Sequence, residues 1–374
     1  MGSRPGGSAA GTPTGRSAVR SGLPDFPWDL LEPAKAKAAA HPGGLVDLSM
    51  GTPVDPVPDI IRAALAAASD APGYPLTAGT VTLRTAISNW VTRVCGAAPG
   101  FGVLPTIGSK ELVAWLPTLL GLGPGDVVAM PSVCYPTYEV GARLAGATAV
   151  RVADPSSAPP ETRLLWINSP GNPDGSVISA DRMREIVAWA RANDVVLASD
   201  ECYATLGWEE QPTSALAVCE GDYTGVLAVH SLSKRSNLAG YRAGFLAGDP
   251  ALVAALLAVR KHAGMIVPQP VQAAMIAALG DEAHAEVQRQ RYAERRAALR
   301  PALEAAGFTI DGSRAGLYLW ARRGDDGWAT VDQLADLGIL AAPGDFYGPA
   351  GHPYVRLALT ATDERIATAV ARLS

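Results

Sequence analysis

The chain has few cysteines, no long apolar run and no long basic block, and each shortage excludes a class of protein. The four cysteines in 374 residues form no C-x-x-C pair and have no nearby histidine at metal-ligand spacing. Reduced thiols in the cytoplasm are therefore expected, with neither a disulfide framework nor a metal site. No apolar run reaches about 18 residues, so no membrane span is expected. The formal net charge of −5 argues against nucleic acid as the main partner.

The composition is typical of a globular protein with one large domain or two. Hydrophobic residues make up 48% of the chain and charged residues 18%. Residues 1–24 are rich in Gly, Ser and Pro and lack the apolar core of a signal peptide. This segment is predicted to be a disordered tail.

Strand and helix patterns alternate through the middle of the chain. Between two predicted strands, "SADRMREIVAWARAN" has the 3.6-residue period of an amphipathic helix, with Ser179 as its N-cap. Such alternation predicts an α/β fold whose mostly parallel sheet is covered by helices on both faces. The predicted strands are 127–131, 147–152, 164–168, 195–200 and 226–231.

The last third of the chain changes character. A long charged helix is expected from residue 283, followed by short strands and a closing helix, which together predict a smaller α+β domain. We expect a large cofactor-binding domain at residues 46–282 and a small domain at residues 283–374. The N-terminal segment, residues 25–45, is expected to pack with the small domain.

Three of the predicted strands run into polar residues, namely Asn172, Asp200 and Lys234. In α/β sheets, ligands bind beyond the carboxyl ends of the strands, so these side chains are expected to meet. A lysine there can bond covalently to a carbonyl, and an aspartate can keep a pyridine nitrogen protonated, as pyridoxal 5′-phosphate requires. Tyr203 and Asn172 can approach the hydroxyl of such a ring, and Arg242 offers a planar fork for a phosphate.

An ordered series of motifs carries a family resemblance over about residues 25–374. "GNPDG", "SDECY" and "SLSKRSNLAGYRAG" resemble the motifs of the class I/II aminotransferases, the fold-type I enzymes dependent on pyridoxal phosphate. The sequence departs from them at Asp174, where threonine is usual and mostly shapes a turn. The resemblance implies that Lys234 bonds to the cofactor, that Asp200 pairs with the ring nitrogen, and that Asn172 and Tyr203 approach the ring oxygen.

The same resemblance implies roles for the remaining site residues. The implied phosphate ligands are Ser109, Lys110, Ser231, Ser233 and Arg242. Tyr135 would stack on the ring, and Tyr74 would reach the phosphate across the interface of a homodimer. Arg356 would bind the substrate α-carboxylate, in a pocket that Gly51 lines.

The stretches "HSLSKRSNLAGYRAGF", "GTPVDPVP", "GYPLTAGT", "RKHAGM" and "APGDFYG" resemble more narrowly the N-succinyldiaminopimelate aminotransferases within this family. This likeness implies transfer of an amino group between glutamate and N-succinyl-2-amino-6-oxopimelate, in lysine and diaminopimelate biosynthesis. Arg260, Lys261 and His262 are candidates for binding the distal end of the acceptor; the alternative is that they only end a helix. Other hypotheses stay open: an aminotransferase for aspartate, alanine or an aromatic amino acid, a pyridoxal-phosphate-dependent β-lyase, and a ligand-sensing regulator.

Overall fold

A seven-stranded sheet forms the centre of the larger part of the molecule. The computed structural model describes residues 23–24 and 26–374, so most of the predicted tail lies outside the described residues. The sheet order is β2-β8-β7-β6-β5-β3-β4, and β8 is antiparallel to both its neighbours. The strands are β2 (Gly102–Ile107), β3 (Val127–Pro131), β4 (Thr148–Val152), β5 (Thr162–Asn168), β6 (Val196–Asp200), β7 (Val226–Ser231) and β8 (Ala243–Gly248).

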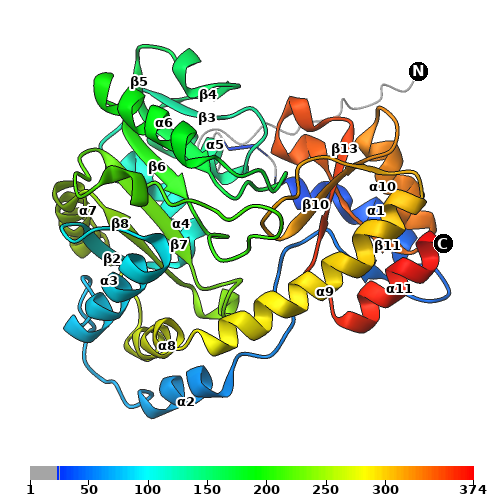
Figure 1. Cartoon of the computed structure of the whole chain (residues 1–374), viewed down its shortest axis with the longest axis horizontal. Helices are drawn as coiled ribbons and strands as arrows, with labels where there is room; N and C mark the ends of the chain where they lie inside the picture. Colours follow the sequence, from blue (N-terminus) through cyan, green and yellow to red (C-terminus); the bar gives the residue numbers. More distant parts are fainter. Residues whose placement is uncertain (1–22, 25) are drawn as a thin grey trace, which may run out of the picture.

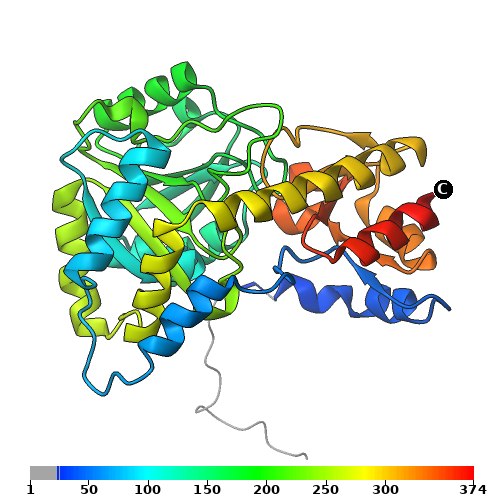
Figure 2. The same cartoon turned by 60° about the horizontal axis from the view of Figure 1, so that its bottom comes forward.

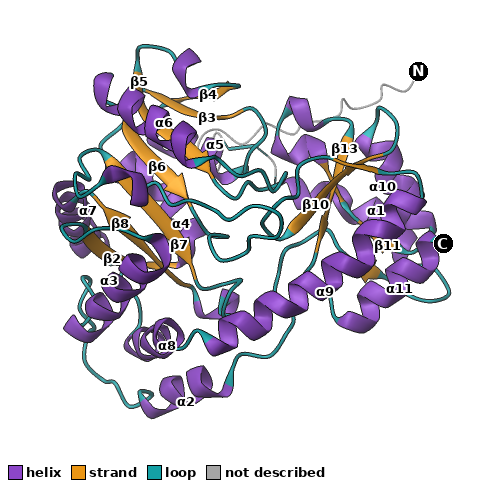
Figure 3. Cartoon of the chain, in the orientation of Figure 1, coloured by secondary structure: helices purple, strands orange, loops and turns teal. Residues whose placement is uncertain are grey.

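Helices cover both faces of this sheet (Figure 3). Trp90, Met183 and Met275 belong to one hydrophobic core, and Leu112 and Leu256 belong to a second core. Successive residues of a strand face opposite sides, so Leu197 packs into the first core and Ala198 into the second. The helices of this part are α2 (Asp59–Ala67), α3 (Val81–Cys95), α4 (Gly108–Leu119), α5 (Thr137–Ala145), α6 (Ala180–Ala192), α7 (Pro250–Ala263) and α8 (Gln269–Gly280).

The predicted helix after Ser179 forms as α6. The Ser179 side chain accepts a hydrogen bond from the Arg182 backbone N–H at 3.3 Å, as expected of an N-cap. The side chains that the helical period assigned to its apolar face, Met183 and Ile186 among them, are buried. The α/β fold class is therefore confirmed, with an antiparallel pair of strands, β2 and β8, at one edge of the sheet.

A second, smaller part has its own sheet and its own core. Its four-stranded antiparallel sheet has the order β12-β13-β10-β9, and β1 pairs in parallel with β11. The N-terminal segment packs here, since Leu31 and Val46 lie in the same core as Trp320. The elements are α1 (Glu32–Ala39), β1 (Val46–Asp47), α9 (Ala283–Ala305), β9 (Thr309–Ile310), β10 (Tyr318–Arg322), α10 (Gly327–Asp336), β11 (Ile339–Leu340), β12 (Ala342–Pro343), β13 (Tyr354–Ala358) and α11 (Asp363–Leu373).

Helix α9 runs from the larger part to the smaller one (Figures 1 and 2). Tyr292 on this helix donates a hydrogen bond to the backbone carbonyl of Lys234 at 3.2 Å. Arg295, one turn further, pairs with Asp55 at 2.6 Å. The first contact ties α9 to the loop that carries Lys234, and the second ties it to the segment between β1 and α2. The two parts are thus held together next to the predicted site. The predicted domain boundaries themselves stay a prediction.

Within the described part of the chain, we find no helix that combines the length and the apolar character needed to cross a bilayer.

Candidate active site

A cavity of about 770 Å³ lies at the carboxyl ends of the central strands and extends to the smaller part of the molecule. Strands β5, β6 and β7 run parallel, so the segments that follow them meet at one edge of the sheet. Arg356 comes from β13, on the other side of the cavity. The predicted site residues that line the cavity are Gly51, Ser109, Lys110, Tyr135, Asn172, Asp200, Tyr203, Ser231, Ser233, Lys234, Arg242 and Arg356.

Lys234 presents its amine inside this cavity. The Nζ donates a hydrogen bond to the backbone carbonyl of Gly51. Burial lowers the pKa of Lys234 below its ordinary value, because a low-dielectric environment disfavours the ammonium ion. An amine with a lowered pKa is unprotonated more often and is therefore a better nucleophile and base.

Asp200 is a buried carboxylate whose hydrogen bonds come from neutral groups. Its Oδ2 accepts a hydrogen bond from the Tyr138 hydroxyl at 2.8 Å, and its Oδ1 accepts one from the Cys202 backbone N–H at 3.2 Å. Burial raises the pKa of Asp200, while these two hydrogen bonds oppose the rise. No basic side chain among the described residues forms an ion pair with this carboxylate, so the site leaves it available to a cationic ligand group.

One end of the cavity is built to hold an anion. The Ser231 Oγ accepts a hydrogen bond from the Ser233 backbone N–H at 3.1 Å, which orders the loop between β7 and Lys234. Ser109 lies in the first turn of α4, where backbone N–H groups are free to bind an anion. Arg242 adopts a left-handed backbone conformation (φ +57°), which is strained for a residue with a side chain.

A close contact at Gly108 shapes this anion-binding end. The glycine has a φ of +72°, and a Cβ added to it would lie only 2.9 Å from Cζ of Arg242. The guanidinium therefore lies against the start of α4 only because residue 108 has no side chain. Lys110 completes the positive end: burial, followed by the neighbouring Arg242, lowers its pKa.

Arg356 and Asn172 meet on the opposite wall. The Arg356 Nη1 donates to Asn172 Oδ1 at 2.9 Å, and its Nη2 donates to the Ser49 carbonyl at 2.7 Å. The guanidinium Cζ lies 3.9 Å from the centroid of the Tyr318 ring, a cation–π distance. Tyr318 also hydrogen-bonds through its hydroxyl to that of Tyr203, at 3.1 Å. The Arg356 Nε is buried without a hydrogen-bond partner, so this arginine retains a free donor.

Some predicted residues lie away from the cavity of this chain. Tyr74 is 98% exposed and does not line the cavity. Arg260 is fully buried, and its guanidinium makes a two-pronged ion pair with Glu111 at 2.9 and 3.1 Å. Both Nη atoms of Arg260 are thus paired with the carboxylate of Glu111. Lys261 and His262 are exposed at the end of α7, and their proposed contact with the acceptor stays a prediction.

Sequence reasoning missed several residues that shape the site. Tyr138 reaches Asp200 while stacking on Trp166, with the ring centroids 4.8 Å apart. Phe26, Trp28 and Phe346 form an aromatic wall, with centroid distances of 5.6 and 5.4 Å along the series. Tyr138 stands three residues after Tyr135 in "SVCYPTY", which is a signal that could have been used. The aromatic wall joins distant segments and has no local signal.

Comparisons with known proteins agree with this geometry. The family model described as "Aminotransferase class I and II" matches residues 44–373. The chain is 60% identical to the "4-dedimethylamino-4-oxo-anhydrotetracycline transaminase OxyQ" of Streptomyces rimosus, covering 94% of this chain and 99% of that protein. It is 59% identical to a "probable aminotransferase" of Mycobacterium tuberculosis, covering 98% and 89%. A solved structure of a "probable N-succinyldiaminopimelate aminotransferase" from Thermus thermophilus has a TM-score of 0.85 and 30% identity, and the match covers 93% and 99%.

Proposed function

Because this chain belongs to the class I and II aminotransferases, we propose that it moves an amino group between glutamate and N-succinyl-2-amino-6-oxopimelate. The observation that carries the proposal is the meeting of Lys234, Asp200 and Arg356 in one cavity. The acceptor is suggested by the motifs of the sequence and by the similarity to the probable N-succinyldiaminopimelate aminotransferase of Thermus thermophilus.

The cofactor of this family is pyridoxal 5′-phosphate, and the donors in the cavity suit it. Its phosphate would be held by Ser109, Ser231, Ser233 and Arg242, whose close approach to α4 depends on Gly108. Its pyridine nitrogen would pair with Asp200, a buried carboxylate hydrogen-bonded by neutral donors. Asn172 and Tyr203 would bind the ring oxygen, and Tyr135 would stack on the ring.

The protein's own groups then have separable tasks in the reaction. When bound, pyridoxal phosphate supplies the reactive carbonyl and the electron sink. Lys234 Nζ acts as the base that removes the proton from Cα of the amino donor, a task that a lowered pKa favours. Arg356 holds the donor's α-carboxylate and thereby orients Cα towards that amine. Asp200 keeps a positive charge on the pyridine nitrogen by remaining ionised.

The active form is proposed to be a homodimer. Tyr74 is almost fully exposed in the single chain, on the loop between α2 and α3. By resemblance to the family, its hydroxyl would reach the phosphate in the site of a second copy. The exposed Lys261 and His262 would contact the acceptor in the same way.

A second acceptor class is favoured by the aromatic wall. Phe26, Trp28 and Phe346 line the cavity side by side, and aromatic side chains are a surface on which a flat ring system packs well. The name of the Streptomyces rimosus relative describes it as a transaminase of a 4-oxo-anhydrotetracycline. A ketone on a fused ring system is therefore the alternative to the succinylated acceptor.

Turnover with each acceptor separates the two proposals. With glutamate as donor, we expect the succinylated acceptor to exceed the ring ketone by about 100-fold or more in kcat/KM, since a site that hydrogen-bonds polar groups of its substrate rejects an analogue that lacks them by at least this factor. The measurement is 2-oxoglutarate release from glutamate. With aspartate, alanine or phenylalanine as the alternative donor, the measured product is oxaloacetate, pyruvate or phenylpyruvate. A higher kcat/KM with the ring ketone than with the succinylated compound would identify the ring ketone as the acceptor class. Pyruvate release from cystathionine without any transfer would favour a β-lyase.

A Tyr138→Phe variant tests the support of Asp200. Loss of the 2.8 Å hydrogen bond removes a donor to a buried carboxylate, an interaction worth about 1.5–3 kcal/mol. We expect kcat to fall about 10- to 100-fold, since about 1.4 kcal/mol corresponds to a factor of ten.

The control is Tyr223→Phe, because that buried tyrosine donates to the Ala98 carbonyl and does not line the cavity. Steady-state kinetics across pH, with cofactor absorbance to report binding, would compare the two variants. Equal kcat values for Tyr138→Phe and the wild type would exclude the supporting role of Tyr138.

A further inference from the structure

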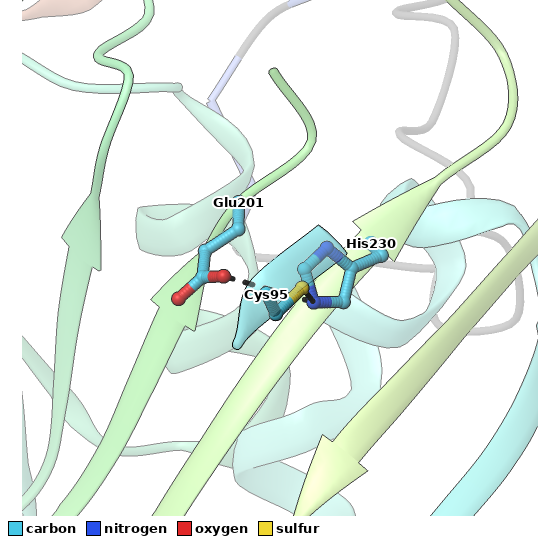
Figure 4. A group of neighbouring side chains, drawn as sticks. All are labelled: Cys95, Glu201 and His230. Carbon is cyan, nitrogen blue, oxygen red and sulfur yellow. Dashed lines mark hydrogen bonds and ion pairs between the residues drawn. The ribbon is translucent and has the colours of Figure 1, made fainter. Parts of the chain in front are cut away.

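Three buried side chains from distant parts of the chain meet in the interior of the larger part of the molecule (Figure 4). Cys95 ends helix α3, Glu201 directly follows β6, and His230 lies within β7. Each is at most 6% exposed. Their sulfur, oxygen and nitrogen atoms all lie within 4.8 Å of one another. None of the three has a task in the reaction proposed above.

The spacing of these atoms is too long for strong hydrogen bonds and suits a shared metal ion. The His230 Nε2 lies 3.7 Å from Cys95 Sγ and 3.7 Å from Glu201 Oε2. Zinc bonds of about 2.3 Å to sulfur and 2.0–2.2 Å to nitrogen and oxygen, at tetrahedral angles, separate neighbouring ligand atoms by about 3.3–3.6 Å. The two separations from His230 Nε2 therefore exceed those of a zinc site by only a few tenths of an ångström, and the third, between Cys95 and Glu201, is within 4.8 Å.

A second observation points to a missing partner. The Glu201 Oε2 is buried and has no hydrogen-bond partner, although the other oxygen of the same carboxyl group accepts from the Ser199 hydroxyl at 2.9 Å and from the Ala215 N–H at 2.8 Å. A buried carboxylate oxygen without a partner is costly, and a metal bond would satisfy it. Its nearest partner in the cluster, His230 Nε2, is beyond hydrogen-bond distance.

The surroundings hold the three ligands in place and can complete the coordination. The His230 ring packs between Trp90 and Phe245, with both centroid distances 5.1 Å, which fixes its orientation. The Ser214 side chain lies next to both Cys95 and Glu201, so a further oxygen donor is close to the cluster. One thiolate and one carboxylate would also balance the charge of a divalent ion.

We propose that Cys95, Glu201 and His230 form a structural zinc site. Cysteine sulfur, imidazole nitrogen and carboxylate oxygen are each donor types that zinc binds in proteins. The ion would cross-link the end of α3 to β6 and β7, the two strands that carry Asp200 and Ser231 to the active site. Since the ligands are buried, zinc enters while the chain folds.

The metal content of the full-length, cofactor-bound protein tests this proposal independently of its substrate. Protein without a polyhistidine tag, produced in zinc-supplemented medium and dialysed against a chelator, is expected to retain about one zinc per chain by elemental analysis. Zinc-edge X-ray absorption should show a single sulfur neighbour at about 2.3 Å. No retained zinc, or zinc without a sulfur neighbour, would overturn the proposal.

Two serine variants locate the site. Cys95→Ser should lower the retained zinc at least about tenfold, because it removes the thiolate ligand. Cys219→Ser is the matched control: that thiol is equally buried, donates to the Ala215 carbonyl at 3.1 Å and does not belong to the cluster. It should keep its zinc. Equal zinc in both variants would exclude Cys95 as a ligand. If Cys95→Ser does not fold, the sulfur neighbour of zinc in the X-ray absorption spectrum of the wild-type protein decides whether a cysteine binds the ion.

Discussion

Replacement of Lys234 by alanine is expected to lower kcat/KM at least about 10³-fold, which is within the range of a lost general base. The reason is that Lys234 supplies an amine whose pKa is lowered by burial, at the carboxyl ends of the strands and facing Gly51. Stopped-flow or steady-state kinetics with glutamate would measure the loss. Cofactor absorbance would show whether the variant still binds pyridoxal phosphate through the groups around Ser231 and Arg242.

A Lys234→Arg variant distinguishes loss of the base from loss of charge. Arginine keeps the positive charge but is not deprotonated in proteins, so it cannot act as a base or nucleophile. Its activity should be as low as that of the alanine variant. Substantial turnover by either variant would mean that another group performs the proton transfer, and Lys110, which also lines the cavity, would be examined next.

Local sequence pattern predicted the strands that carry the site. Parallel strands are buried on both faces, so "LLWIN" and "VLAVHS" appear as continuous apolar runs that a reader can find without a structure. Polar residues directly after such runs lie at one edge of the sheet, and Asn172, Asp200 and Lys234 do line one cavity. Arg356 was predicted from the family resemblance. It belongs to the sheet of the smaller part, and hydrophobic periodicity alone could not show that it meets the other three residues.

The antiparallel edge of the sheet was not predicted, for physical reasons. Strand β8 reads "AGFLAG" and β2 contains Pro105, and glycine and proline are signals of turns rather than strands. Gly244 is needed within β8 because an added Cβ would lie 2.9 Å from the backbone N of Ser109. The approach of α4 to the sheet thus determines that residue, and this is a tertiary contact.

Contacts between distant segments explain the other omissions. His230 is separated from Cys95 by 135 positions, so no local ligand spacing exists for the cluster described above. The sequence analysis therefore predicted no metal site. The aromatic wall is similar, since Phe346 meets Trp28 only after the N-terminal segment packs on the smaller part. Such sites depend on the fold as a whole and not on any stretch of it.

Replacement of Arg356 by lysine is expected to reduce kcat/KM for glutamate about 30-fold or more. Truncation of one partner of a buried charged pair costs about 2–5 kcal/mol, and lysine lacks the planar fork that binds a carboxylate through two hydrogen bonds. In the structure the guanidinium is held by Asn172 and Ser49 and lies against the Tyr318 ring, so its position is defined before substrate arrives. Kinetics with glutamate over a wide concentration range would measure the loss.

A donor without a carboxylate shows whether this loss reflects substrate binding. If Arg356 binds the α-carboxylate, the variant loses activity with glutamate but not with a simple primary amine, so the ratio between the two donors falls. Equal losses with both donors would instead assign Arg356 to the structure of the cavity, through its hydrogen bonds to Asn172 and Ser49. The variant is expected to retain the cofactor in either case, because Arg356 is not among the proposed phosphate ligands. The ratio of activity with glutamate to activity with the amine thus distinguishes substrate binding by Arg356 from its role in holding the cavity together, although the same side chain contributes to both.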